Sequence, residues 1–122
     1  FLQRVTRGYT DAFHSFLAEG VDPDTRDRYG RTALMIAAPK GAEPTVKLLL
    51  AKGADVNARN GYGLTPLMYA ASSGQTHIAP LLIAHGADVN ARSTGGKTAL
   101  TLAQEKKHRD MVKLLTMAGA KP

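Results

Sequence analysis

One seven-residue segment occurs twice in the chain, and its spacing constrains the fold more than any other feature. Residues 53–59 read Gly-Ala-Asp-Val-Asn-Ala-Arg, and residues 86–92 repeat them without a difference, 33 residues further along. A fixed period between about 20 and 50 residues is typical of stacked supersecondary units. The chain is therefore predicted to be a repeat array.

Other positions recur at the same offset. They include Gly30, Gly63 and Gly96; Thr32, Thr65 and Thr98; and Leu34, Leu67 and Leu100. Each period also holds two apolar segments, and Gly41 and Gly74 stand between them, where a helix needs a left-handed C-terminal residue. Each period is therefore expected to fold as helix, turn, helix and extended loop. Such pairs must stack, because none can bury its apolar face alone.

Residues 65–71 carry a more specific motif. They read Thr-Pro-Leu-Met-Tyr-Ala-Ala, and looser copies begin at Thr32 and Thr98. The motif resembles the Thr-Pro-Leu-His-x-Ala-Ala pattern of the ankyrin repeat, and the resemblance covers essentially the whole chain. It implies an all-α repeat fold, an ankyrin solenoid of stacked helix-turn-helix pairs with β-hairpin loops. It implies little about function, because one scaffold can take many partners.

The length of 122 residues suits a single domain. Within residues 1–122 we expect a partial N-terminal repeat over 1–26, with a helix near 10–18. Two internal repeats follow, over 27–59 and 60–92, and a C-terminal capping repeat occupies 93–122.

Three departures from the repeat pattern predict local differences. Lys107 stands where the other units have glycine, so the preceding helix is expected to strain or to end differently. Pro80 falls in a second-helix segment and is tolerated only in a first turn, so that helix is expected to start late, near His77. Three other residues replace the family's loop-bonding His: Met35, Met68 and Thr101.

No catalytic constellation is found, and the chain is predicted to be a non-enzyme without metal or cofactor. The absence of Cys excludes a disulfide framework and a thiolate zinc site. The four His residues show no metal-ligand spacing. Residues 95–98 read Gly-Gly-Lys-Thr, but a phosphate loop also needs glycine where Ala91 stands.

Recurring polar residues have structural interpretations. Asp22, Asp55 and Asp88 would lie roughly 10 Å apart in stacked units, too far for paired acid–base chemistry, and we expect them to bond loop amides. Asn57 and Asn90 occupy the position that asparaginyl hydroxylation can modify in eukaryotic ankyrin proteins. A turn-forming role is the favoured interpretation for both, and modification stays open.

In the ankyrin family, partner contacts come from the hairpin tips and from the exposed side of each first helix. Carried over by position, this implies the following binding residues: Arg28, Tyr29, Arg31, Lys40, Arg59, Tyr62, Leu64, Ser72, Ser73, Arg92, Lys97 and Lys106. Tyr29 and Tyr62 stand out, because the third copy has Gly95 there and the fold does not require an aromatic residue. Tyr69 and Ile36 align with a buried apolar position of the family and are expected in the core.

Two classes of function follow. The favoured class is a protein-binding module that uses the concave face and hairpin tips, with regulation or inhibition of a partner enzyme by occlusion of its active site as one use. The alternative is an electrostatic binder of nucleic acid or an acidic surface, since residues 92–122 carry +5 of the net charge of +6. That region lacks aromatic residues for base stacking, which disfavours nucleic acid.

We expect a monomer when free. No apolar run approaches the ~18 residues of a membrane span, so no membrane partner is expected. The chain begins with Phe1, and its location is open: cytoplasmic, or periplasmic or secreted if a signal peptide preceded it.

Overall fold

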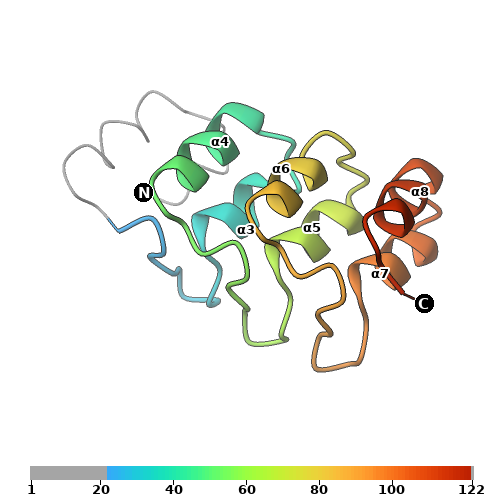
Figure 1. Cartoon of the computed structure of the whole chain (residues 1–122). Coiled ribbons are helices and arrows are strands. Elements are labelled where there is room, and N and C mark those ends of the chain that lie inside the picture. The colour runs from blue at the N-terminus through green and yellow to red at the C-terminus, as the bar shows by residue number, and fades with distance from the viewer. Residues whose placement is uncertain (1–21, 122) are drawn as a thin grey trace.

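The computed structural model describes residues 22–121, and in this range the chain forms three helix pairs (Figure 1). The helices are α3 (Ala33–Ala37), α4 (Glu43–Ala51), α5 (Pro66–Ser72), α6 (Ala79–Ala84), α7 (Ala99–Glu105) and α8 (Arg109–Met117). The helix expected near residues 10–18 lies outside the described residues.

The helices form two layers, and the long loops project on one side (Figure 1). The first helices of the pairs form one layer, in which α5 contacts both α3 and α7. Each second helix packs on its own partner: α4 on α3, α6 on α5 and α8 on α7. This is the stacked arrangement predicted from the repeat.

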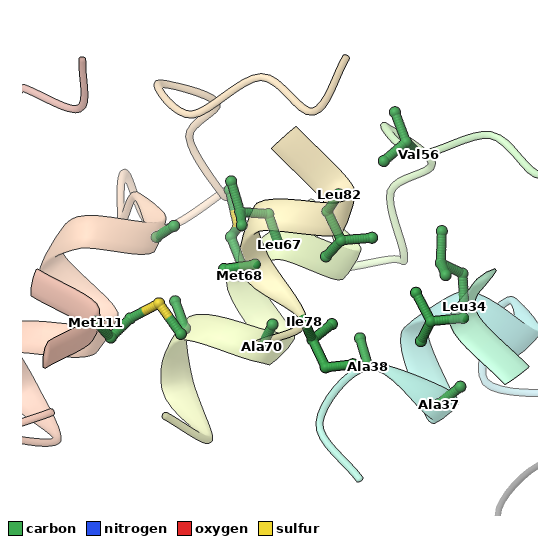
Figure 2. Packing of buried hydrophobic residues seen from close by; sticks show 14 of the residues in the cluster. Leu34, Ala37, Ala38, Val56, Leu67, Met68, Ala70, Ile78, Leu82 and Met111 are labelled. Atoms are coloured by element: carbon green, nitrogen blue, oxygen red, sulfur yellow. The ribbon is translucent and has the colours of Figure 1, made fainter. Parts of the chain in front are cut away.

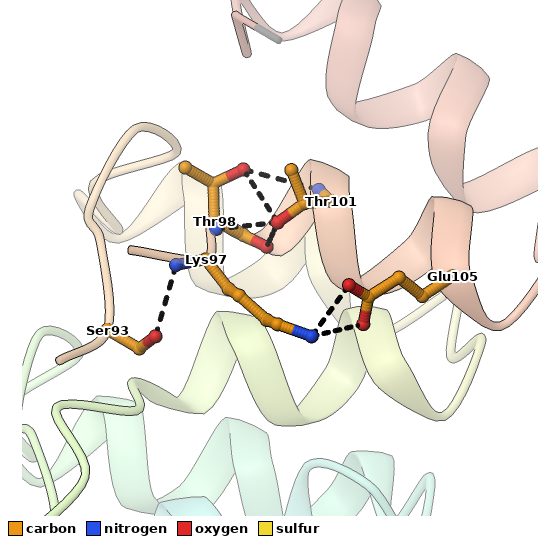
Figure 3. A network of polar contacts seen from close by, with 5 residues as sticks. All are labelled: Ser93, Lys97, Thr98, Thr101 and Glu105. Carbon is orange, nitrogen blue, oxygen red and sulfur yellow. Dashed lines mark hydrogen bonds and ion pairs between the residues drawn. The ribbon is translucent and has the colours of Figure 1, made fainter. Parts of the chain in front are cut away.

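The recurring threonines start the first helices. The buried hydroxyls of Thr32, Thr65 and Thr98 accept hydrogen bonds from backbone amides in the first turn, at 3.4, 3.3 and 3.2 Å. In α7, the Thr101 hydroxyl also accepts from the Thr98 amide at 2.8 Å, which completes a capping box (Figure 3). The two threonines of α7 therefore each accept the backbone N–H of the other, and both amides at the start of the helix have a partner.

The ends of the first helices confirm the prediction about glycine. Gly41 and Gly74 both have φ of 69°, and Lys107 has φ of 60° at the equivalent position. Lys107 is the one residue other than glycine with a left-handed backbone in the described range. The cost of this conformation is about 1–2 kcal/mol for a residue with a Cβ atom, so the last helix pair carries local strain.

Proline sets the start of α6. Glu43 and Arg109 begin α4 and α8, whereas the equivalent Thr76 precedes α6, which begins at Ala79. Pro80 therefore lies in the first turn, where its missing N–H is not needed. The predicted late start is confirmed, and it comes two residues beyond the expected His77.

One apolar cluster runs through all three helix pairs (Figure 2). Leucines supply its bulk, whereas alanines with no exposed surface, among them Ala37, Ala70 and Ala103, let neighbouring helices approach closely. Ile36 is 5% exposed and belongs to this core, as expected. Burial of such side chains stabilises the fold by about 1.5–3 kcal/mol for each large one.

The loops differ in one respect from the expected β-hairpins. Each tip closes with two backbone bonds across the turn: in the first tip, the Asp27 N–H donates to the Arg31 carbonyl at 2.9 Å and the Gly30 N–H donates to the Asp27 carbonyl at 3.0 Å. The part of the chain that the structure describes holds one isolated bridge, between Arg26 and Thr32, and no extended strand. The arms are hairpin turns without a ladder, because these bonds stay within the turn and do not continue as pairing along the arms.

Candidate protein-binding face

The side chains of Asp27 and Asn60 fold the first two hairpin tips. The Asp27 carboxylate accepts the amides of Tyr29 and Arg31, both at 2.9 Å. Asn60 does the same for Tyr62 and Leu64, at 2.9 and 3.0 Å. This turn chemistry fixes the backbone on both sides of each tip tyrosine.

The two tip tyrosines are therefore presented to solvent. Tyr29 is 62% exposed and Tyr62 is 74% exposed. With Met117 on α8, they are the large apolar or aromatic side chains that are exposed in the described range. Both tyrosines lie on loops that a rigid scaffold positions, where binding residues are concentrated.

Two arginines flank the Tyr29 ring. The guanidinium carbons of Arg28 and Arg31 lie 5.0 and 5.3 Å from the ring centroid, within the range of a cation–π contact. Arg31 Nε also donates to Asp27 Oδ2 at 2.9 Å. The tip thus holds a cationic aromatic cluster in a fixed arrangement.

This turn lowers the pKa of the Asp27 carboxyl. Partial desolvation acts to raise its pKa, but the hydrogen bonds from the Arg31 amide, the Arg31 guanidinium and the Tyr29 amide outweigh that effect. The net pKa is below the ordinary value of 3.8. Asp27 therefore keeps its charge and its role as an acceptor into moderately acidic solution.

A groove of about 440 Å³ lies between the first two tips. We call it the tyrosine groove, and its lining residues are Tyr29, Arg31, Asn60, Tyr62, Leu64 and Tyr69. Its size falls in the range of natural ligand sites, about 300–1,000 Å³. The groove brings together four of the predicted binding residues and two that were not predicted.

Tyr69 corrects a prediction. It was expected in the core, but it is half-buried on α5 and lines the tyrosine groove. Its hydroxyl accepts a hydrogen bond of 2.7 Å from Asn60 Nδ2, so the polar end of the side chain stays at the surface beside the hairpin. The available signal was the residue type: the equivalent positions carry Ile36 and Leu102, which have no polar atom.

Arginines also join successive tips. Arg26 donates to the Arg59 carbonyl at 2.7 Å, and Arg59 donates to the carbonyl of Arg92. The backbone amide and hydroxyl of Thr94 both donate to the Tyr62 carbonyl at 3.0 Å. Arg59 was predicted as a binding residue, and the structure gives its guanidinium a bond within the chain.

The recurring aspartates and asparagines bond loop backbones. Asp55 and Asp88 each accept an amide two residues ahead at 2.9 Å, and Asp22 does so at 2.8 Å, as predicted. Asn57 reaches the next unit instead: it accepts the Asp88 amide at 2.8 Å and donates to the Gly86 carbonyl at 3.0 Å. Asn90 repeats this pattern toward the C-terminus.

The other predicted binding residues lie along the same array. Lys40, Ser73 and Lys106 are exposed just beyond the ends of α3, α5 and α7. Ser72 is half-buried, and its carbonyl lies 3.0 Å from His108 Nε2. The structure places these residues apart from the tyrosine groove, whose lining includes none of them.

The third tip differs from the first two. Lys97 makes an ion pair with Glu105 at 2.6 Å, so its charge is compensated (Figure 3). Gly95 replaces the tip tyrosine, and Arg92 is exposed. In the described chain, the cationic aromatic cluster is therefore a feature of the first tip, whereas the second tip presents Tyr62.

Other chemistry is sparse in residues 22–121. This range holds no cluster of three or more residues suited to binding a metal ion. None of its helices combines the length and the apolar character needed to cross a membrane.

Comparison with known families supports the repeat assignment. The family model described as ankyrin repeats (3 copies) matches residues 2–93 and 59–122. A comparison with curated proteins gave no match. Ankyrin repeats generally mediate protein–protein interaction, and domains built from them are typically non-catalytic.

Proposed function

Because the chain belongs to the ankyrin-repeat family, we propose that it is a non-catalytic module that binds a partner protein through its concave face and hairpin tips. The observation that carries this proposal is the pair of exposed tip tyrosines, Tyr29 and Tyr62, on either side of a groove. The repeat does not need an aromatic residue there, since Gly95 serves in the third unit.

The chemistry of these tips suits a protein interface. Tyrosine and arginine are enriched among the residues that contribute most to binding, and both occur here in one cluster. The turns that hold them are already formed in the free chain, which lowers the entropic cost of binding. One use of such binding is regulation of a partner enzyme by covering its active site.

The electrostatic alternative draws less support from the geometry. Arg109 and Lys113 are exposed on α8, but Lys97 is neutralised by Glu105. Residues 92–121 carry no aromatic side chain on which a base could stack. The two classes also differ in their salt dependence, which is steep for an electrostatic binder.

The test is a pull-down from the native host with wild type, a Tyr29→Ala/Tyr62→Ala double variant and a Met117→Ala control. Met117 is 80% exposed and lies on α8, away from the tips. We expect a discrete protein that wild type and the control retain at high salt and the double variant loses. An activity assay of that protein, with and without the chain, then tests inhibition.

Capture of acidic material alone, eluted by salt and unaffected by the double substitution, would contradict the proposal. A photocrosslinker placed at position 62, with position 117 as control, tests the same face directly. We expect the partner to crosslink at position 62 and not at position 117.

A further inference from the structure

We propose that the tyrosine groove binds an acidic segment of the partner protein, in which a carboxylate side chain lies next to an apolar one. This inference rests on the proposed function and names the kind of partner segment that the groove fits. It comes from the hydrogen-bonding capacity that the groove residues leave unused.

The donors around the groove exceed its acceptors. Arg28 does not line the groove itself but lies against the ring of Tyr29, which does, and it takes part in no hydrogen bond or ion pair within residues 22–121. Arg31 uses Nε toward Asp27, and its terminal nitrogens make no hydrogen bond to the described chain. The Tyr69 hydroxyl accepts from Asn60, and its own proton has no acceptor in the same range.

The strong acceptors beside the groove are already occupied. Asn60 Oδ1 accepts two amides, as does Asp27 Oδ1, and Asp27 Oδ2 accepts the Arg31 guanidinium. A ligand group that approaches these side chains therefore meets N–H and O–H donors beside the charge of Arg28, which no carboxylate of the described chain compensates, whereas Asp27 compensates the charge of Arg31. A carboxylate matches both features, because its two oxygens accept several hydrogen bonds and carry the opposite charge.

The rest of the lining is apolar. Leu64 and the rings of Tyr62 and Tyr69 line the groove, so a partner must bring an apolar side chain as well as an acidic one. A single-stranded nucleic acid would also offer anions and stacking rings, but it needs a continued basic track with further stacking platforms. Here the third tip has Gly95 and a neutralised Lys97, so one short peptide segment fits better.

The probe is a phage-displayed library of random 12-residue peptides, selected on the full chain. We expect enriched peptides that carry Asp or Glu beside Leu, Phe or Trp. A fluorescein-labelled consensus peptide is then titrated against wild type, Arg28→Gln, Tyr69→Phe and Arg109→Gln by fluorescence polarisation. Arg109 is the matched control, an exposed arginine without a hydrogen bond or ion pair in the described chain.

We expect about ten-fold weaker binding for Arg28→Gln, and a similar loss when the peptide acid is replaced by its amide, since close charge pairs at interfaces couple strongly. The two changes together should weaken binding little more than either one alone. Tyr69→Phe should weaken binding several-fold, and Arg109→Gln should leave it unchanged. Far-UV circular dichroism melts check that each variant is folded.

Several results overturn the inference. Selected peptides without acidic residues, or equal losses for Arg28→Gln and Arg109→Gln, exclude a specific carboxylate site. Tighter binding of a ten-nucleotide oligothymidylate than of the peptide assigns the groove to nucleic acid. Neutral peptides that bind wild type but not the Tyr29→Ala/Tyr62→Ala variant overturn the acidic segment while leaving the proposed function intact.

Discussion

The Tyr69 hydroxyl accepts a hydrogen bond of 2.7 Å from Asn60 Nδ2, and this contact joins α5 to the tip of the loop that precedes it. The Oδ1 atom of the same side chain accepts hydrogen bonds from the backbone N–H groups of Tyr62 and Leu64. One side chain therefore organises the hairpin turn and one wall of the tyrosine groove.

Asn60→Ala is expected to destabilise the chain by about 1–2 kcal/mol, because two turn amides and one tyrosine hydroxyl lose their partner. Urea denaturation followed by circular dichroism measures the loss. Asn60→Asp is the matched control, since aspartate performs the same turn role at position 27. It keeps the acceptor and loses the donor to Tyr69, so its effect should be the smaller one; equal effects would show that the turn amides do not need this acceptor.

Lys107→Gly is expected to stabilise the chain by about 1 kcal/mol, because glycine adopts a φ of 60° without the strain of a Cβ atom. The thermal midpoint should rise accordingly. Lys106→Gly serves as control: Lys106 has φ of −89°, so glycine there removes no strain and only loosens the helix end. A thermal midpoint that rises equally in both variants would point to the removed charge.

Asn57→Ala should cost about 1–2 kcal/mol of unfolding free energy, since it removes two hydrogen bonds to the next unit, to Asp88 and Gly86. Asn90→Ala should cost less, because its bond to the Gly119 carbonyl is longer, at 3.4 Å, and lies at the last unit. Hydrogen exchange of the Asp88 amide gives a local readout. Unchanged protection of that amide in Asn57→Ala is the contrary result.

The low pKa of Asp27 predicts a pH dependence. A carboxyl whose pKa is lower in the folded state stabilises the fold above its ordinary value of 3.8, and this contribution is lost as the pH falls through the folded value. At pH 7, Asp27→Asn should therefore be less stable than wild type, by about 0.2–1 kcal/mol for an ion pair at the surface.

That difference should shrink in acid. Urea midpoints of wild type and Asp27→Asn, compared at pH 7 and pH 3, measure the change, and the amide keeps an oxygen acceptor for the turn as Asn60 does. A difference that stays constant between the two pH values would exclude ionisation of Asp27 as its source.

Most of the fold could be predicted from the repeat period. Threonine caps and left-handed glycine positions depend on neighbours within one unit, so the order of helices and turns, and the strained Lys107, could be predicted from local sequence. The start of α6 was misplaced by two residues, because the position of Pro80 allows either start within a first turn.

The site was less predictable. Exposure of Tyr29 and Tyr62 followed from their place beside the turn glycine. The surface position of Tyr69 depends on Asn60, and the bond from Arg59 depends on the carbonyl of Arg92 in the next unit. The Asn60–Tyr69 contact arises within one unit, where the hairpin folds back beside α5, whereas the Arg59 contact depends on the distance between stacked units. Neither arrangement is contained in the residue pattern alone.

The arginine bonds between tips have a consequence for how such arrays change in length. Arg26 donates to the Arg59 carbonyl, and Arg59 donates to the equivalent carbonyl of Arg92, so donor and acceptor follow the repeat period. A unit duplicated in the gene would bring its own acceptor for the preceding arginine and its own donor for the following carbonyl. The array could thus gain or lose whole units while each remaining tip keeps its spacing. Binding surfaces of different lengths could then be built with the same arginine-to-carbonyl bond between successive tips.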